Sequence, residues 1–97
     1  MIKNNIIEIS SYNISTESTE FLDGECISAD SDYFTTIPHE FGWFINIWDK
    51  PYNSSIYIPE DLYKIIDYCF KNSISWIYID RDTPICKEFT NFEYDYM

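Results

Sequence analysis

The clearest pattern of apolar and polar positions in the chain lies in residues 59–72. Apolar side chains recur there at intervals of three and four residues, which places them on one face of a helix. They are Leu62, Ile65, Ile66, Cys69 and Phe70. Pro59 suits the first position of a helix, and Asn72 suits the residue just beyond its end. The pattern predicts an amphipathic helix across this segment.

Other segments carry the β-branched and aromatic residues that strands favour. The strongest is residues 43–48, where alternation places Trp43, Ile45 and Ile47 on one face. A turn containing Pro and Asn at residues 49–53 is predicted to join it to a return strand in a hairpin. That return strand is residues 55–58, further strands are predicted at 6–9 and 75–79, and weaker signals lie at 33–34 and 85–86.

A shorter helix is predicted after the first strand. Ser15 or Thr16 provides an N-cap, and Glu17 and Glu20 follow where the helix dipole favours acidic side chains. Gly24 is expected to end this helix after about two turns. The polar, acidic stretch that follows, residues 25–33, is predicted to be a loop.

The order strand, helix, strand, strand, helix, strand predicts a single α+β domain over residues 1–97. It would have two layers, a mostly antiparallel sheet of about four strands with two helices on one face. Since Leu and Val are scarce, aromatic residues are expected to fill much of the core. The candidates are Trp43 or Trp48, Trp76, Phe70 and Phe21. The 19 aromatic residues exceed what so small an interior can hide, so some Tyr side chains are expected at the surface.

Composition excludes several classes of protein. The 97 residues carry 17 acidic and 6 basic side chains, a net charge of -11. Direct nucleic-acid binding is not expected, because such domains carry a basic face. No apolar run approaches the roughly 18 residues of a membrane span, and the first residues do not resemble a secretory signal. A cytoplasmic protein is therefore expected.

The placement of the charge is more informative than its sum. Nine acidic residues and no Lys or Arg occur between Asn4 and Asp49. Like charges without interleaved counter-charges repel and destabilise the fold, whereas ordinary surfaces mix both signs. We therefore predict a partner-binding surface of acidic side chains with Tyr anchors, the residue type enriched at interface hot spots. Its predicted members are Glu17, Glu20, Asp23, Glu25, Asp30, Asp32, Tyr33, Glu40, Glu93, Tyr94, Asp95 and Tyr96.

No other motif indicates a metal, a cofactor or catalysis. Cys26, Cys69 and Cys86 lack the spacing of a zinc site, so buried free thiols are expected. His39 lies in residues 38–42, a predicted turn, without a recognisable nucleophile or orienting partner. An exposed or turn-stabilising histidine is the favoured interpretation. Asp30-Ser31-Asp32 does not match a calcium loop.

The segment Asp80-Arg81-Asp82-Thr83 follows an apolar strand. It resembles the nucleophile strand of phosphatases in the haloacid-dehalogenase superfamily, which carry Asp-x-Asp-x-Thr. Thr83 stands one place too early for that motif. We favour a turn at the strand end in which an Asp accepts backbone N–H groups and Arg81 pairs with an acid. No enzymatic activity is predicted.

Short motifs along nearly the whole chain resemble a domain-of-unknown-function family of small acidic proteins. They are Ser10-Ser11, Ile14-Ser15, Thr19, Phe21-Leu22, Gly42-Trp43-Phe44-Ile45, Pro59-Glu60-Asp61-Leu62, Trp76-Ile77, Asp80-Arg81-Asp82 and Tyr94-Asp95-Tyr96. The family often has a His where this chain has Tyr12-Asn13, and a Gly where it has Thr83. The resemblance implies an origin on bacterial plasmids or phages. It assigns no activity and no binding residues.

Two functions fit these observations. The first is an inhibitor that imitates nucleic acid and blocks the nucleic-acid-binding site of a bacterial defence complex, as anti-CRISPR and anti-restriction proteins do. Its carboxylates would occupy Lys and Arg sites that normally hold phosphates. The second is an immunity protein or antitoxin that neutralises a basic toxin. In both the partner is a basic protein, and a homodimer is also compatible with the aromatic surplus.

Overall fold

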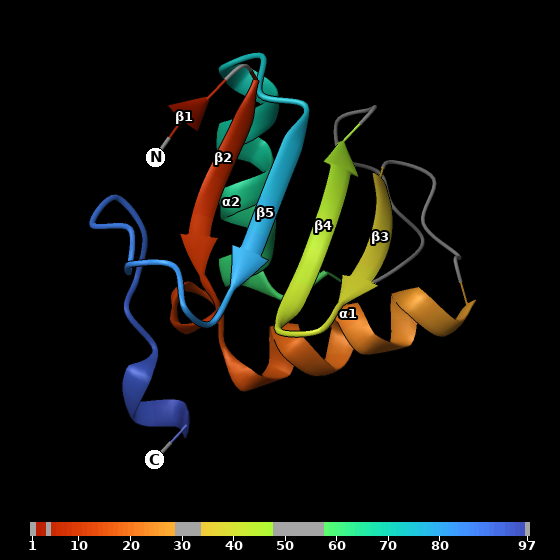
Figure 1. The fold of residues 1–97 in the computed structure, drawn as a ribbon, viewed down its shortest axis with the longest axis vertical. Coiled ribbons are helices and arrows are strands. Elements are labelled where there is room, and N and C mark those ends of the chain that lie inside the picture. Colours follow the sequence, from red (N-terminus) through yellow and green to blue (C-terminus); the bar gives the residue numbers. More distant parts are fainter. Residues whose placement is uncertain (1, 4, 29–33, 48–57, 97) are drawn as a thin grey trace.

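A mixed β-sheet forms one layer of the protein, and two α-helices form the other (Figure 1). The computed structural model describes residues 2–3, 5–28, 34–47 and 58–96. In chain order the elements are β1 (Ile2–Lys3), β2 (Ile6–Ser10), the 3-10 helix η1 (Ser11–Asn13), α1 (Thr16–Ser28), β3 (Phe34–His39), β4 (Gly42–Ile47), α2 (Glu60–Lys71), β5 (Trp76–Asp80) and the 3-10 helix η2 (Glu93–Tyr96).

The strands are arranged in the order β1-β2-β5-β4-β3. β2 and β5 are parallel, whereas β1 with β2, β4 with β5 and β3 with β4 are antiparallel. The predicted α+β class and the mostly antiparallel sheet are therefore confirmed. Because β2 and β5 are parallel, both end at the same edge of the sheet, where the β3–β4 turn also lies (Figure 1). This edge positions the candidate site.

The core between sheet and helices is built from isoleucine. Alternate positions of β2, β4 and β5 point toward the helices, where α1 and α2 complete the packing. The buried residues are Ile7, Ile9, Ile45, Ile47, Ile77 and Ile79 from the sheet, and Leu22, Leu62, Ile65, Ile66 and Cys69 from the helices. β-branched side chains pack well on a pleated surface, so Ile suits a thin two-layer core.

The prediction that aromatic residues fill the core was wrong. Trp76 is 36% exposed and Phe70 is 41% exposed, so neither is a core residue. Phe21 and Trp43 are partly buried and pack against the margin of the core. Trp48 lies outside the described residues. Isoleucine side chains fill the core instead, and the rings of Trp76 and Phe70 lie at the surface.

The predicted helix at residues 59–72 is confirmed as α2, whose buried stripe faces the sheet. Its first turn also stabilises the start of α1. The carboxylate of Asp61 accepts from the Ser15 N–H at 2.8 Å, the Ser15 hydroxyl at 2.9 Å and the Ser18 hydroxyl at 2.8 Å. The Ser15 hydroxyl in turn accepts the Ser18 N–H at 3.2 Å, which confirms the N-cap at Ser15.

The structure corrects the predicted end of the first helix and both ends of the turn predicted at residues 38–42. α1 continues through Gly24 to Ser28, into the predicted loop at residues 25–33, of which 29–33 lie outside the described residues. β3 extends through Pro38 to His39, and the turn is confined to residues 40–41. Pro38 is tolerated because β3 lies at the edge of the sheet that the described residues form.

The predicted hairpin partner of β4 was also wrong. β4 pairs with β3 and β5, whereas the expected return strand at residues 55–58 lies outside the described residues except for Ile58. The weak signal at residues 85–86 does not correspond to a strand, because both residues lie in irregular structure. The signal at residues 33–34 does mark the start of β3 at Phe34.

The C-terminal segment after β5 runs beside β2 and is fastened by Asn13 (Figure 1). The buried amide of Asn13 donates to the carbonyls of Cys86 at 3.0 Å and Thr90 at 3.2 Å. Its oxygen accepts the N–H groups of Cys86 at 2.8 Å and Ser10 at 3.2 Å. The amide thus satisfies four backbone groups and holds this segment near the ends of β2 and β5.

Candidate functional site

α1 lies across the edge of the sheet where β2 and β5 end (Figure 1). Asp23 of α1 and Glu40 of the β3–β4 turn line one groove at this edge. Glu17 and Glu20 are exposed on the same helix, and Asp82 is exposed just after β5. We call these five residues, Glu17, Glu20, Asp23, Glu40 and Asp82, the acidic end. α1 contains no Lys or Arg beside its exposed carboxylates.

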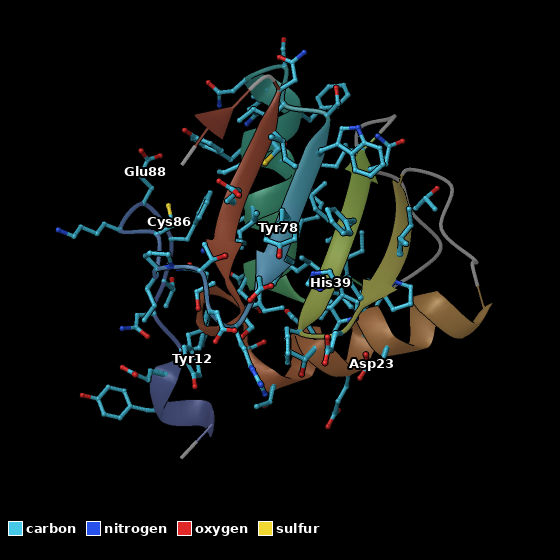
Figure 2. The ribbon with its side chains drawn as sticks, in the orientation of Figure 1. Tyr12, Asp23, His39, Tyr78, Cys86 and Glu88 are labelled. Atoms are coloured by element: carbon cyan, nitrogen blue, oxygen red, sulfur yellow. The ribbon has the colours of Figure 1, made fainter. Side chains whose placement is uncertain are left out.

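A groove of about 470 Å³ opens at the acidic end. Carboxylates, hydroxyls and rings line it together, among them Asp23, Glu40, Tyr12, Trp43 and Arg81. The Trp43 indole N–H donates to Asp23 at 3.2 Å, which holds that carboxylate against β4. Figure 2 shows Tyr12 and Asp23 on either side of this edge, with His39 above them. The groove presents negative charge beside aromatic surface.

Arg81 is the one cation among the described residues that line this groove. Its guanidinium lies over the ring of Phe41, 4.4 Å from the ring centroid. The predicted role of Arg81 was pairing with an acid. Beside a hydrogen bond from Tyr78, its charge helps to lower the pKa of the adjacent Asp80, and its guanidinium lies over an aromatic ring. The site is therefore acidic overall, and one of its rings already accepts a guanidinium group.

His39 is half-buried beside the groove rather than freely exposed. Its Nδ1 accepts the Phe41 N–H at 3.3 Å, so the histidine does stabilise the turn as predicted. Its Nε2 lies 2.9 Å from the carbonyl oxygen of Ile79 and donates to it. The ring also stacks on Tyr78 (Figure 2). These contacts hold the end of β3 against β5.

Asp80 has the turn role that the sequence favoured over a phosphatase nucleophile. Its carboxylate accepts the Asp82 N–H at 2.7 Å and the Tyr78 hydroxyl at 2.6 Å. The Tyr78 hydrogen bond, helped by the Asp82 N–H, lowers the pKa of Asp80 below its ordinary value. The same bond raises the pKa of Tyr78. A carboxylate committed to two donors is a structural element of this edge.

The charges of α2 are arranged differently from those of α1. Lys64 pairs with Glu60 at 3.1 Å, and Lys71 pairs with Asp67 at 2.9 Å. Both pairs have the four-residue spacing that brings side chains together on a helix. The third acidic side chain of α2, Asp61, accepts hydrogen bonds from Ser15 and Ser18 instead. Among the described residues, α2 therefore carries two ion pairs, whereas α1 carries acidic side chains and no basic one.

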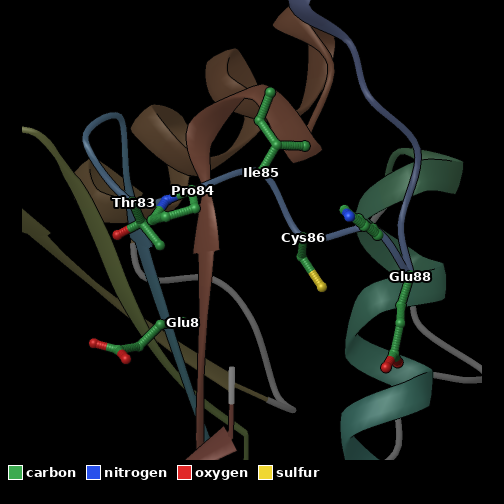
Figure 3. Close-up of a pocket in the computed structure, with 7 residues that line it drawn as sticks. Glu8, Thr83, Pro84, Ile85, Cys86 and Glu88 are labelled. Atoms are coloured by element: carbon green, nitrogen blue, oxygen red, sulfur yellow. The ribbon is translucent and has the colours of Figure 1, made fainter.

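A second groove, of about 340 Å³, lies between β2 and the C-terminal segment (Figure 3). Figure 3 shows Glu8 and Glu88 on opposite sides of β2. Glu88 accepts the Tyr68 hydroxyl at 2.9 Å, and Cys86 is buried between β2 and α2.

Burial raises the pKa of the Cys69 thiol to about 12. Among the described residues, Cys69 and Cys86 are buried thiols outside any disulfide, as predicted.

The predicted partner-binding residues fall into three groups. Those on the acidic end are Glu17, Glu20, Asp23 and Glu40, and Glu25 continues along α1. Those in η2 are Glu93, Tyr94, Asp95 and Tyr96, and the Tyr94 side chain is 84% exposed. The Phe92 N–H donates to the Tyr12 carbonyl at 2.7 Å, which fastens the start of η2 to a residue of the groove. Asp30, Asp32 and Tyr33 lie outside the described residues.

Within the described part of the chain, no helix is long and apolar enough to cross a membrane. The described His, Cys, Asp and Glu side chains likewise form no group of three that could hold a metal ion. The aromatic side of the sheet, formed by Tyr78, Phe44 and Trp76, was missed by the sequence interpretation. Its signal was present, because the same alternation that buries Ile45 and Ile77 turns these rings to the opposite face.

A family model described as "Family of unknown function (DUF5983) C-terminal domain" matches residues 6–94. The match includes β2 through β5, both helices and the whole groove at the acidic end. Neither a curated protein nor a solved structure matches the chain.

Proposed function

The chain belongs to the DUF5983 family of unknown function, and we propose that it is a protein inhibitor that occupies the nucleic-acid-binding site of a basic protein. The observation that carries the proposal is the separation of charge between the two helices. On α2, Glu60 pairs with Lys64 and Asp67 pairs with Lys71, whereas α1 contains acidic residues and no Lys or Arg. A surface that keeps uncompensated charge despite the repulsion is best explained by a cationic partner.

The spacing along α1 supports imitation of a nucleic-acid strand. Glu17, Glu20 and Asp23 stand three residues apart, which is about 4.5 Å along a helix axis. One strand of duplex DNA carries a phosphate about every 3.4 Å along its axis. Side chains three residues apart are neighbours on a helix surface, so these carboxylates form a short ladder. Such a ladder can occupy Lys and Arg sites that otherwise hold phosphates.

The groove adds contacts that charge alone would not supply. Carboxylates raise the rate of encounter with a basic surface, and aromatic side chains anchor the complex once it has formed. Tyr12 and Trp43 lie within the groove, and Tyr94 is exposed on the neighbouring η2. Inhibition would be competitive, because the partner cannot hold nucleic acid and this surface together.

The biological setting that we propose is a plasmid or phage. The resemblance of the motifs to mobile-element proteins and the absence of a recognisable catalytic motif support it. The partner would then be a nucleic-acid-binding complex of bacterial defence, of the type that anti-CRISPR or anti-restriction proteins block.

The test begins with affinity purification of the tagged chain from host cells, followed by mass spectrometry. The partner so identified is then assayed for binding to a labelled DNA duplex with increasing amounts of the chain. Two exposed acids are reversed together, as Glu20→Lys and Glu40→Lys. A control with the same change in net charge elsewhere carries Asp67→Lys and Glu88→Lys. Circular dichroism is used to check that both variants are folded.

We expect the chain to displace the duplex, less strongly as salt is raised, and the first variant to lose this effect while the control keeps most of it. Equal inhibition by the two variants would contradict mimicry by the acidic end. Recovery of a toxin encoded beside the chain would instead identify an immunity protein.

A further inference from the structure

One face of the sheet is covered by α1 and α2, and the other carries neither helix (Figure 1). The strand registers arrange the side chains of the uncovered face in three rows across β2, β5, β4 and β3. The first row is Ile6, Trp76, Asn46 and Thr35; the second is Glu8, Tyr78, Phe44 and Ile37; the third is Ser10, Asp80, Gly42 and His39. We call these twelve residues the open face.

Aromatic rings occupy the middle of the open face. Phe44 and Tyr78 are neighbours in the second row, with ring centroids 4.9 Å apart. His39 reaches both rings, at 5.1 Å from each centroid. Trp76 lies one row away on the same strand as Tyr78 and is 36% exposed, and Ile37 at the edge is 44% exposed. These rings form an aromatic platform on the face of the sheet that neither described helix covers.

The charge of the open face is negative. Glu8 lies beside Tyr78 across the β2–β5 pair, and Asp80 lies one row further along β5. None of the open-face side chains that the structure describes is a Lys or Arg. His39 uses the tautomer protonated at Nε2, since Nδ1 accepts a hydrogen bond. Rings with carboxylates beside them are the surroundings that guanidinium groups prefer, through stacking and charge together.

The size of the aromatic platform favours a short peptide segment as its ligand, rather than the broad surface of another folded protein. Four strands about 4.8 Å apart and three rows about 6.7 Å apart make a platform of roughly 14 by 13 Å. A stable dimer buries about 800 Å² on each partner, which is several times larger. Two copies would also bring carboxylates of like charge together, and phosphates would meet the same repulsion.

We propose that the open face binds an arginine-bearing segment of the basic partner, with guanidinium groups stacked on Trp76, Tyr78 and Phe44. The inference rests on the proposed function, because it takes the partner to be a basic protein. The chain offers an internal precedent at the margin of this face, where the Arg81 guanidinium lies over the Phe41 ring at 4.4 Å. Arginine rather than lysine is named because only its planar group stacks on a ring.

The test measures binding of two fluorescent peptides, octa-arginine and octa-lysine, to the full chain by fluorescence anisotropy. The peptides have equal charge, so a difference between them reports on stacking. Trp76→Leu and Phe44→Leu remove rings while keeping apolar bulk. Phe70→Leu is the matched control, since Phe70 is 41% exposed but lies on α2, on the helix side of the sheet. If the double variant is unstable, Trp76→Leu alone serves, because Trp76 is the more exposed ring.

We expect octa-arginine to bind more tightly than octa-lysine, and each ring removed to weaken octa-arginine binding about two- to fivefold. Octa-lysine binding should change little, and Phe70→Leu should leave both affinities unchanged. Equal affinities for the two peptides, or equal losses in the Phe70 variant, would overturn the inference. So would a dimer in sedimentation experiments that Trp76→Leu dissociates.

These outcomes are separable from those of the proposed function. Reversal of Glu20 and Glu40 should weaken binding of both peptides in parallel, because it changes charge and leaves the rings in place. Loss of inhibition in that variant together with unchanged arginine selectivity would support both proposals. Inhibition that depends on the acidic end but is indifferent to Trp76 and Phe44 would overturn only the open-face inference.

Discussion

The imidazole of His39 lies almost parallel to the ring of Tyr78, with centroids 5.1 Å apart and 6° between the planes. Gly42 permits this contact, because it is the register partner of both His39 and Asp80 and has no side chain to fill the space between them. The histidine passes over that space to reach the Ile79 carbonyl at 2.9 Å. Because Gly42 in β4 has no side chain, His39 of β3 can reach across it and hydrogen-bond to β5 at the edge where the candidate site lies.

Gly42→Ala should therefore destabilise the protein. The added Cβ would overlap the Ile79 carbonyl oxygen, and β4 would have to shift away from β5. The expected loss in the free energy of unfolding is about 1–3 kcal/mol, the range for overpacked sites. Urea denaturation followed by circular dichroism measures it.

Gly24→Ala is the matched control, because a Cβ at Gly24 meets nothing within 4 Å and the residue lies inside α1. That change should stabilise the protein by up to about 1 kcal/mol. Similar effects at the two glycines would contradict the close approach at Gly42.

The two glycines also show how far the sequence could predict the fold. Gly24 follows the apolar pair Phe21-Leu22 and was predicted to end the helix. In the structure α1 continues through Gly24 to Ser28, and Leu22 is buried in the core. Local propensity cannot weigh such tertiary contacts. By contrast, the alternation of β4 and the stripe of α2 from Leu62 to Cys69 were correctly predicted, since periodicity directly encodes burial on one face; Phe70, also assigned to that stripe, is exposed.

The candidate site was only half predictable for a related reason. The acids of α1 were recognised because no base separates them along the chain. The pairing of β3 with β4 brings Glu40 into one groove with Asp23 of α1. The same pairing allows His39 to stack on Tyr78. The sequence favoured a different hairpin, so it could not bring these residues together. Strand order is a non-local property that short motifs do not specify.

Asp61→Ala should detach the start of α1 from α2. The carboxylate accepts three hydrogen bonds from Ser15 and Ser18, and its removal leaves part-buried donors without that acceptor. We expect a loss of about 2–4 kcal/mol in the free energy of unfolding, since bonds to charged groups contribute about 1.5–3 kcal/mol each and are not additive. Thermal and urea unfolding would measure this loss.

Glu60→Ala supplies the comparison for that change, because Glu60 is the adjacent residue and forms only an exposed pair with Lys64. Such pairs contribute roughly 0–1 kcal/mol, so its variant should stay close to the wild type. If both alanine variants were equally stable, the inter-helix role of Asp61 would be refuted.

The Cys69 thiol should be unreactive in the folded protein. Burial raises its pKa to about 12, so almost none of it is thiolate at pH 8, and the side chain is fully buried. In a variant with Cys26→Ser and Cys86→Ser, iodoacetamide should label Cys69 only as fast as the protein unfolds. Mass spectrometry over a urea series gives the rate, and labelling in native buffer at the rate of a free thiol would contradict this prediction.

Tyr78 donates a hydrogen bond to Asp80. The stability lost in Tyr78→Phe should therefore become smaller both at low pH and at high pH. Asp80 has a lowered pKa in the folded protein, so the stability it contributes is present above its unfolded pKa, near 3.8, and is lost as the pH falls through the folded value. Tyr78 has a raised pKa, so its contribution is present below its unfolded pKa, near 10, and is lost as the pH rises through the folded value.

The difference in unfolding free energy between the wild type and Tyr78→Phe should therefore be largest from about pH 5 to 9 and shrink toward both extremes. Other titrating groups contribute equally to both proteins and cancel in the difference. Urea denaturation at a series of pH values measures it, with Tyr94→Phe as the control because Tyr94 is 84% exposed. The control difference should stay near zero throughout. A Tyr78 difference that is constant with pH, or that grows in acid, would mean that Asp80 and Tyr78 are not coupled as their 2.6 Å separation implies.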